Sequence, residues 1–205
     1  MNRIKKVALI IIIGCFFILS FDDFTNNYFY KNFEEKIITE KEILKCNSDI
    51  PEGYYDVEVL EGNVSIGLRL LSEGELYHNY LISKDSNFFV DHGKGKVKIS
   101  LPKRKILQEN FLLKNYGNYV VGTDILEGTY RITLKVDKNK NNKLSVELYE
   151  NINIAIDTYS FKGENDNIVI HLKNNQILSI SRPLIDEYKE NLTKGFIMEF
   201  EFLKQ

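Results

Sequence analysis

Three histidines, His78, His92 and His171, are the side chains of this sequence best suited to acid–base chemistry or metal binding. A hydrolytic triad needs a histidine within hydrogen-bond reach of a nucleophile and of an orienting acid. His92 stands in a stretch rich in glycine and lysine, which is typical of a solvated loop. His171 alternates with apolar neighbours, so we expect it to point outward from a strand. The sequence therefore predicts no catalytic residues, no cofactor site and no metal site.

Two further segments have compositions that can bind phosphate or Ca²⁺. Residues 93–96 read Gly-Lys-Gly-Lys, but they lack the spacing of a phosphate-binding loop and the Ser or Thr that would hold magnesium. Residues 137–141 alternate Asp or Asn with lysine, yet Asn142 stands where a Ca²⁺ loop needs glycine and Leu148 where it needs a bidentate glutamate. We interpret the first segment as a turn and the second as a hairpin loop.

Composition excludes several classes of protein. The chain has 205 residues, 27 basic and 29 acidic side chains and a net charge of -2, so it has no general attraction for nucleic acid. At 43% hydrophobic residues it can fill a core. Its 2 cysteines cannot build a disulfide scaffold. We expect Cys46, the thiol outside the apolar N-terminal segment, to be buried and inert, with a bridge between two chains as the alternative.

The N-terminus has the pattern of a membrane address. Arg3, Lys5 and Lys6 precede an apolar run over residues 7–21, and two aspartates follow it. The positive-inside rule predicts a cytoplasmic N-terminus, a signal anchor over residues 1–24 in the cell membrane and an extracellular remainder. The run is shorter than the roughly 20 residues of a full span. A signal peptide cleaved after Ser20 and a lipoprotein anchored at Cys15, which follows Gly14, are the alternatives.

Residues 25–46 are interpreted as a stalk, and a helix is the structure that their pattern allows. Phe29, Phe33, Ile37 and Leu44 recur at helical spacing with lysines and glutamates between them. We expect this segment to pack under the domain that follows. The alternative is a helix lying on the membrane surface, but its glutamates disfavour contact with anionic lipid.

The chain beyond the stalk repeats itself. Residues 49–55, Asp-Ile-Pro-Glu-Gly-Tyr-Tyr, recur as Asp-Ile-Leu-Glu-Gly-Thr-Tyr at residues 124–130, and residues 97–101 match residues 168–172. Each copy contains about six short segments with strand-like alternation, separated by turn residues such as those at 61–63 and 92–95. The motif residues with structural roles are Asp49, Gly53, Tyr55, Gly122, Asp124, Gly128 and Tyr130, where the glycine before the tyrosine allows a positive φ.

The sequence predicts an all-β fold: two tandem antiparallel β-sandwich or small-barrel modules after an N-terminal membrane helix. The modules span residues 47–110 and 118–182, with a packed connector at 111–117. After them, residues 183–205 contain a helix near 185–193 and a closing strand at 196–203. A unit of about 60 residues is marginal alone, so we expect the modules to share one body.

Residues 121–130 resemble the Val-Gly-x-Asp-Ile-(Pro/Ala)-x-Gly-x-Tyr signature of small β-rich modules in secreted and membrane-anchored proteins of Gram-positive bacteria. The resemblance extends over residues 118–182, and more loosely over residues 47–108, where Cys46, Asn47 and Ser48 replace the Val-Gly-Thr lead-in. It implies a fold and a location at the cell surface. It implies no activity, because the family is commonly regarded as one of unknown function.

Three classes of function remain open. The leading hypothesis is a non-catalytic, membrane-anchored β protein that binds or assembles with an envelope protein or glycan. The second is a cell-wall or carbohydrate-binding module, for which 12 tyrosines offer stacking surfaces although tryptophan is absent from the sequence. The third is a secreted hydrolase, which would need a deep pocket of acidic side chains.

Overall fold

The computed structural model describes residues 33–67, 69–84, 86–90, 92–103, 106–137, 144–151, 154–182 and 195–204. Within these ranges the chain forms fifteen strands and no helix, so the prediction of an all-β fold is confirmed. The predicted signal anchor, Cys15 and the predicted helix near residues 185–193 lie outside the described residues. No helix in the described ranges is both long and apolar enough to cross a membrane.

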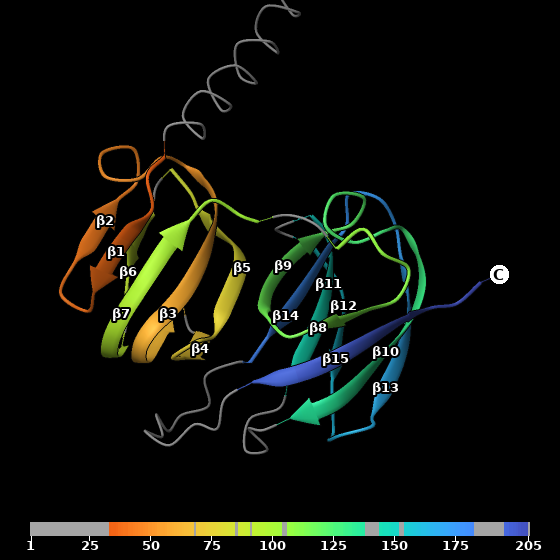
Figure 1. The fold of residues 1–205 in the computed structure, drawn as a ribbon. Helices are drawn as coiled ribbons and strands as arrows, with labels where there is room; N and C mark the ends of the chain where they lie inside the picture. The colour runs from red at the N-terminus through yellow and green to blue at the C-terminus, as the bar shows by residue number, and fades with distance from the viewer. Residues whose placement is uncertain are drawn as a thin grey trace, which may run out of the picture. The chain divides into compact units, whose positions relative to one another are not determined.

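The N-terminal region, residues 35–103, contains the first seven strands (Figure 1). They are β1 (Lys36–Thr39), β2 (Ile43–Lys45), β3 (Gly53–Ile66), β4 (Arg69–Ser72), β5 (Leu76–Ile82), β6 (Asn87–Phe89) and β7 (His92–Ser100). The long strand β3 pairs with β4, β5 and β7, all antiparallel, and β1 pairs with the other edge of β7. Strands β2 and β6, which are far apart in the sequence, form a separate two-stranded antiparallel sheet.

The C-terminal region, residues 106–204, contains the other eight strands. They are β8 (Phe111–Leu113), β9 (Tyr116–Val120), β10 (Gly128–Asp137), β11 (Ser145–Asn151), β12 (Ile154–Ser160), β13 (Asn167–Leu172), β14 (Ile177–Ser181) and β15 (Phe196–Phe202). One four-stranded sheet has the order β13-β10-β15-β8, and the strands β9-β14-β11-β12 continue the sheet of the N-terminal region.

One short pairing joins the two regions into a nine-stranded sheet. Strands β5 and β9 run parallel, with Tyr77 opposite Tyr116 and His78 opposite Gly117. All other strand pairs in the described residues are antiparallel. Residues 35–205 cluster as one compact unit. The β5–β9 pairing is therefore the place where the two regions are held together by backbone hydrogen bonds.

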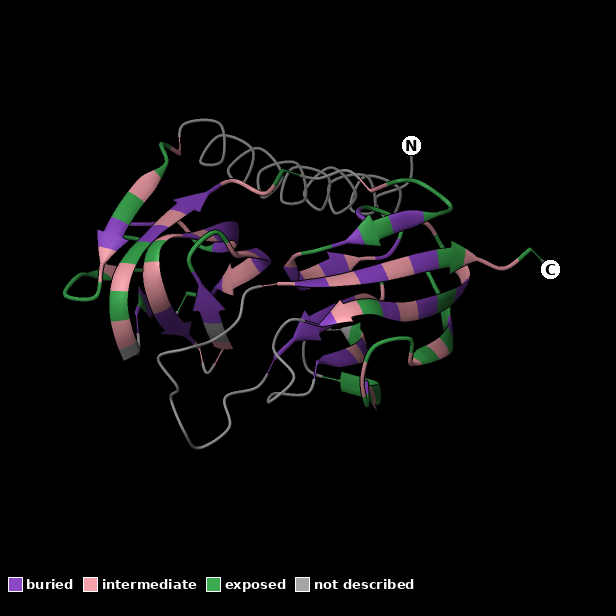
Figure 2. Ribbon diagram, turned by 60° about the horizontal axis from the view of Figure 1, so that its bottom comes forward, coloured by how far each residue is buried: buried purple, intermediate pink, exposed green. Residues whose placement is uncertain are grey.

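Alternation along the strands builds the cores. On β15, Phe196, Met198 and Phe200 are buried while the residues between them are half-buried, and Figure 2 shows this alternation along the strand. Strands β10 and β15 are adjacent, and Phe200 lies within ring contact of Tyr130, with 6.1 Å between the ring centroids. Phe111 of β8 stacks on Phe200 at 4.5 Å. Strand β15 thus lies inside its sheet, between β10 and β8, and its aromatic side chains fill the core of the C-terminal region.

The expected helix over the stalk is wrong for its described C-terminal part. Residues 36–39 and 43–45 form the strands β1 and β2, and the remaining stalk residues 25–32 lie outside the described ranges. Helical spacing selected Ile37, but in the strand Ile38 is buried at 2% exposure and Ile37 is 59% exposed. The apolar spacing in this segment fits both the helical period of 3.6 residues and the strand period of two residues. Pairing of β1 with β7 determines that the chain adopts the strand.

Two predicted turns are also wrong, and for a single reason. Residues 61–63 belong to β3 and residues 92–95 to β7, and the two segments pair with each other. A Cβ at Gly62 would lie 2.0 Å from the carbonyl oxygen of Lys94, and one at Gly95 would lie 2.2 Å from that of Glu61. These glycines therefore allow a close approach of two strands at a bulge. The Gly-Lys-Gly-Lys segment is part of this ladder.

The Ile-Leu pair at residues 106–107 resembles the pair at 177–178, where β14 begins, but it belongs to no strand. Ile106 forms only an isolated bridge with Ile125. The connector residues Phe111, Leu113 and Tyr116 are buried, whereas Leu112 is exposed. The chain between the two regions therefore contributes β8 and the start of β9.

Candidate functional site

The motif aspartates Asp49 and Asp124 each close a turn, and the two turns have the same hydrogen bonds. We call residues 45–50 the first turn and residues 120–125 the second turn. The Asp49 carboxylate accepts the backbone N–H of Lys45 at 2.9 Å, and Asp124 accepts that of Val120 at 2.9 Å. The N–H of each aspartate returns to the carbonyl of the same residue, at 2.9 and 2.7 Å. The sequence motif thus specifies the turn by local hydrogen bonds.

The other motif residues also have matching positions. Gly122 has a φ of 86°, and its counterpart in the first turn is Asn47, with a φ of 65°. Asparagine is among the non-glycine residues that adopt this region most readily. Gly53 and Gly128, which begin β3 and β10, have φ values of 157° and 150°.

The motif tyrosines anchor the chain that leaves each turn. Tyr55 and Tyr130 are both fully buried, and each hydroxyl donates to a backbone carbonyl four residues earlier, at 2.8 Å to Pro51 and 3.1 Å to Leu126. These tyrosines serve the core and the turn together, since burying a hydroxyl without a partner would be unfavourable.

The two turns differ in what surrounds them. Asp49 is exposed, and the charges near its carboxylate come from its own turn and nearby lysines. Asp124 is 1% exposed and also accepts the side-chain N–H of Asn79 at 3.0 Å. Its other carboxylate oxygen lies 3.8 Å from Nε2 of His78. The second turn is therefore part of a polar cluster that connects the two regions.

We name this cluster the junction network and define it as Asp56, His78, Asn79, Asn118 and Asp124. Asp56 lies on β3, and its Oδ1 is 2.7 Å from Nδ1 of His78 on β5. The same carboxylate accepts the backbone N–H groups of Asn79, at 3.3 Å, and of Lys103, at 3.0 Å. Asp56 is 3% exposed and His78 6% exposed. A buried histidine is thus held between two buried carboxylates that come from different regions of the chain.

Two asparagines close the network across the β5–β9 pairing. The amide N–H of Asn79 donates to the carbonyl of Asn118 at 2.8 Å, and that of Asn118 donates to the carbonyl of Asn79 at 3.1 Å. Between these strands, a Cβ on Gly117 would lie 2.3 Å from the carbonyl oxygen of His78. The absence of a side chain at Gly117 is what lets the two strands approach and the amides meet.

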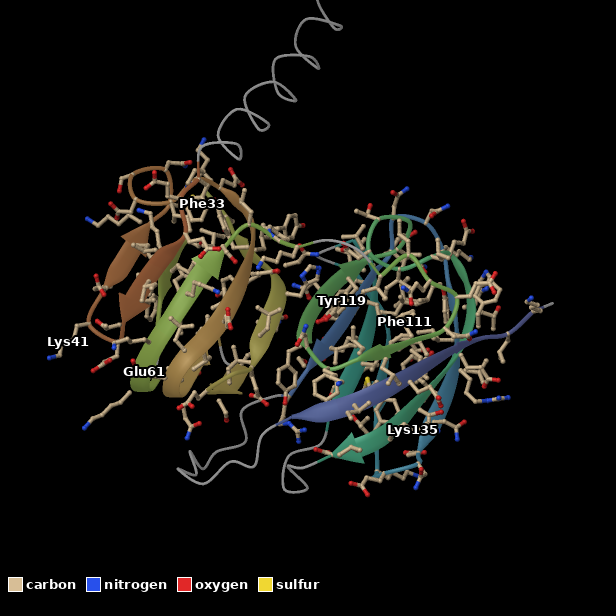
Figure 3. The ribbon with its side chains drawn as sticks, viewed as in Figure 1. Phe33, Lys41, Glu61, Phe111, Tyr119 and Lys135 are labelled. Carbon is tan, nitrogen blue, oxygen red and sulfur yellow. The ribbon has the colours of Figure 1, made fainter. Side chains whose placement is uncertain are left out.

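The ring of His78 is also covered by an aromatic side chain. Tyr119, labelled in Figure 3 on β9, stacks on His78 with 5.0 Å between ring centroids and 29° between ring planes. Its hydroxyl donates to the carbonyl of Asn115 at 2.9 Å. Burial, and then the charge of Asp56, raise the pKa of Tyr119 well above its ordinary value. Tyr119 therefore stays neutral wherever the histidine changes its charge.

The electrostatics of the network favour a charged histidine. Burial alone lowers the pKa of His78, but its interactions with Asp124 and Asp56 outweigh burial and raise that pKa to about 9. At neutral pH the imidazole is then a cation between two carboxylates. Both ring nitrogens face carboxylates or Asn79, and neither contacts a hydroxyl or thiol among the described residues. An imidazolium is protonated on both ring nitrogens and cannot take a further proton from a nucleophile.

A cavity of about 440 Å³ adjoins the network. Its lining comes from both regions and consists of Asp56, Glu58, Gly74, Leu76, His78, Lys98, Ser100, Lys103, Ile106, Asn115, Tyr119 and Asp124. We call it the charged cavity. Lys98 and Glu58 form an ion pair at 2.5 Å on its wall. The hydrogen bond to Glu58 is the main cause that raises the pKa of Lys98. The cavity therefore offers the Glu58–Lys98 ion pair and the buried carboxylates of Asp56 and Asp124 beside His78.

Of the other residues considered for chemistry, His171 and Cys46 do not line this cavity. His171 is exposed on β13, where Nδ1 is 3.0 Å from the hydroxyl of Thr129. His92 begins β7 and lies opposite Ser65. Cys46 is half-buried. Residues 138–143, which include most of the predicted hairpin loop, lie outside the described ranges. Within those ranges no group of three His, Cys, Asp or Glu side chains is arranged to hold a metal ion.

Sequence reasoning identified Asp124 for its turn but missed the network around it. Asp56 occupies a polar position in an alternating strand, and such a position normally faces solvent. His78 carried no motif, and Asn79 and Asn118 are separated by 39 positions. Only the β5–β9 pairing brings these residues together, and a parallel pairing of two residues leaves no periodic signal.

No family model matches the chain, and no curated protein is similar to it in sequence.

Proposed function

We propose that this chain is a membrane-anchored extracellular β protein that acts by binding or assembly in the cell envelope and not by catalysis. Its two tandem β modules form one rigid body that presents binding surfaces. An envelope protein or a glycan is the partner, and nucleic acid is not.

The anchor is supported by the sequence of the N-terminus. Arg3, Lys5 and Lys6 precede the apolar residues 7–21, and the charge asymmetry directs the remainder of the chain outward. The resemblance of residues 121–130 to modules of Gram-positive surface proteins agrees with that location.

The tandem modules are supported by the two turns. Six backbone and side-chain hydrogen bonds recur between the first and second turns and the strands that follow, with every pair of distances within about 0.3 Å. Each turn leads into a long strand, β3 or β10, that pairs with antiparallel neighbours. Equal local geometry at an offset of 75 residues supports a duplicated unit.

The observation that carries the binding role is the state of His78. Its two ring nitrogens face Asp56 on one side and Asp124 with Asn79 on the other, and the stacked Tyr119 covers its ring. This arrangement stabilises a junction between two regions, and it favours an imidazole protonated on both nitrogens, which has no lone pair left to act as a base. A rigid junction with an adjacent cavity suits recognition.

Two experiments on the full chain test the proposal. In intact protoplasts, added protease should digest the β region, and survival of this region until lysis would show that the topology is wrong. In the second, the detergent-solubilised chain is incubated with purified cell-wall material and with detergent-extracted membrane proteins. We expect it to sediment with the wall material or to co-purify with a protein of the membrane extract. We also expect it to release no soluble sugar or peptide from the wall. Release that is lost in a His78→Gln variant would establish a hydrolase instead.

A further inference from the structure

A second cavity lies on the opposite side of β9 from the charged cavity. Its volume is about 180 Å³, and its lining consists of Tyr54, Arg69, Leu81, Asn118, Tyr149, Ile177 and Ser179. We call it the aromatic cavity. Asn118 lines the aromatic cavity whereas its neighbour Tyr119 lines the charged one, and successive residues of a strand point to opposite faces. The aromatic cavity is therefore also built from both regions, with Tyr54, Arg69 and Leu81 on one side.

Arg69 gives this cavity a positive charge that belongs to no ion pair of the described residues. It is half-buried, its guanidinium lies 5.1 Å from the ring centroid of Tyr77, and Nη1 donates to the carbonyl of Gly67 at 3.1 Å. In the described part of the chain, no carboxylate forms an ion pair with Arg69, and its buried Nε has no acceptor. The other arginines in that part, Arg131 and Arg182, each pair with a carboxylate at 2.7 Å.

An arginine without an ion-pair partner is suited to bind a carboxylate ligand. Buried charges in proteins are ordinarily paired, and a guanidinium offers parallel N–H groups that match the two oxygens of a carboxylate. With Nη1 bound to Gly67 and Nε buried, Nη2 is the guanidinium nitrogen that remains for a ligand carboxylate. The carboxylate of Glu147 accepts the hydroxyl of Tyr149, and it forms no ion pair with Arg69 among the described residues.

The rest of the lining suits a sugar ring. Tyr54 and Tyr149 are half-buried aromatic side chains, which can stack on the apolar face of a ring. The hydroxyl of Tyr54 is a further polar group of the lining, whereas the side chains of Asn118 and Ser179 already hydrogen-bond within the protein. At about 30 Å³ per water molecule, the cavity has room for roughly six waters, which is the scale of one ring and not of an oligosaccharide.

We propose that the aromatic cavity binds an acidic sugar, with the ligand carboxylate on Arg69 and one ring face against the tyrosines. This inference rests on the proposed binding role in the envelope and names the ligand class and the site. A terminal or branching acidic sugar of an envelope glycan has the required chemistry.

Titration of the full-length chain in detergent with small probes tests the ligand class. We expect glucuronate to bind, detected by calorimetry or by ligand-observed NMR, with a dissociation constant on the order of 1 mM. Glucose, which has the same ring without the carboxylate, should bind at least about tenfold more weakly. Equal binding of glucose would overturn the role of Arg69. Tighter binding of acetate or of acetyl-alanine would overturn the sugar and indicate a simple or peptide carboxylate.

Variants of the arginine test the location of the site. Arg69→Lys keeps the charge but removes the planar fork, and we expect it to weaken glucuronate roughly tenfold or more. Arg131→Lys on the exposed face of β10 is the matched control and should bind as the unmodified chain does. Equal binding by both variants would place the ligand elsewhere. Melting temperatures of both variants verify that they fold, and the glucuronate–glucose comparison requires no variant at all.

The acidic-sugar site and the proposed function can be refuted separately. A chain that binds no glucuronate but still sediments with wall material, or with a membrane protein, retains the envelope role and loses the acidic-sugar site. A chain that binds glucuronate but whose β region resists protease in protoplasts retains the site and loses the predicted topology.

Discussion

The first and second turns have the same local design and different surroundings. In each, an aspartate accepts the N–H of the residue four positions earlier, and a tyrosine hydroxyl returns to the chain beyond the turn. Asp49 makes its contacts at the exposed surface, whereas Asp124 is buried against His78 and Asn79. A single motif thus serves as a turn in one region and as part of the junction network in the other.

The comparison shows how a repeated unit can acquire an asymmetric site. The second turn keeps its own hydrogen bonds, so contact with the junction network uses a carboxylate that is already fixed in position. The partner residues all come from strands of the N-terminal region or from β9. Preorganisation by the turn reduces the conformational entropy lost when Asp124 meets the histidine.

The largest expected effect separates the two aspartates. Asp124→Ala removes a turn acceptor and leaves the buried cation of His78 with one carboxylate fewer, so we expect the free energy of unfolding to fall by about 3–5 kcal/mol. Asp49→Ala removes the equivalent turn acceptor at an exposed position, so its loss should be clearly smaller. Urea denaturation of both variants measures the difference. Equal losses would show that Asp124 acts through its turn alone.

The second prediction concerns pH. The pKa of His78 is raised to about 9 from an ordinary value of 6.5, so the charged histidine stabilises the fold fully below about pH 6.5. This contribution is lost as the pH rises through about 9, and the expected loss is about 3 kcal/mol at most. Stability measured between pH 6 and 10 should decline accordingly. The decline should disappear in His78→Gln and persist in His171→Gln, which changes an exposed histidine.

Third, the β5–β9 pairing can be broken without a change in either turn. Gly117→Ala would place a Cβ 2.3 Å from the carbonyl oxygen of His78, at a φ of 139°. We expect a loss of about 2–3 kcal/mol, from strain and overpacking together. Gly163→Ala is the control, because a Cβ there meets no atom within 4 Å. If Gly117→Ala unfolds at the same urea concentration as the control, the strand pairing contributes little to the junction.

Much of the fold was accessible from the sequence because its signals are local. Period-two alternation indicated strands such as Gly128–Asp137 and Asn167–Leu172, and the offset of 75 residues indicated equivalent turns. The errors occur where the local pattern is ambiguous. Gly62 and Gly95 were interpreted as turn residues, although they allow two strands to approach. Glycine marks both situations, and only the pairing of distant segments distinguishes them.

The candidate site was less accessible than the fold. Asp124 was identified through its motif, whereas Asp56 and His78 had the appearance of ordinary polar strand residues. Their burial depends on β9, which pairs with β5 through only two residues. No composition, spacing or periodicity in one sequence encodes such a contact, and the aromatic cavity around Arg69 depends on the same pairing.

The smallest predicted effect returns to the glycines that leave the two turns. Gly53 and Gly128 have φ values of 157° and 150°, which disfavour a side chain, so alanine at either position should cost about 1 kcal/mol. At Gly128 a Cβ would also lie 2.2 Å from the ring of Phe202, which must move away. Gly128→Ala should therefore lower the melting temperature more than Gly53→Ala. Since Phe202 pairs with Tyr130 at the end of β15, a Gly128→Ala/Phe202→Leu double variant should recover the part of the loss that is steric. Calorimetry of the single and double variants measures both terms, and no recovery would mean that backbone strain alone determines the cost.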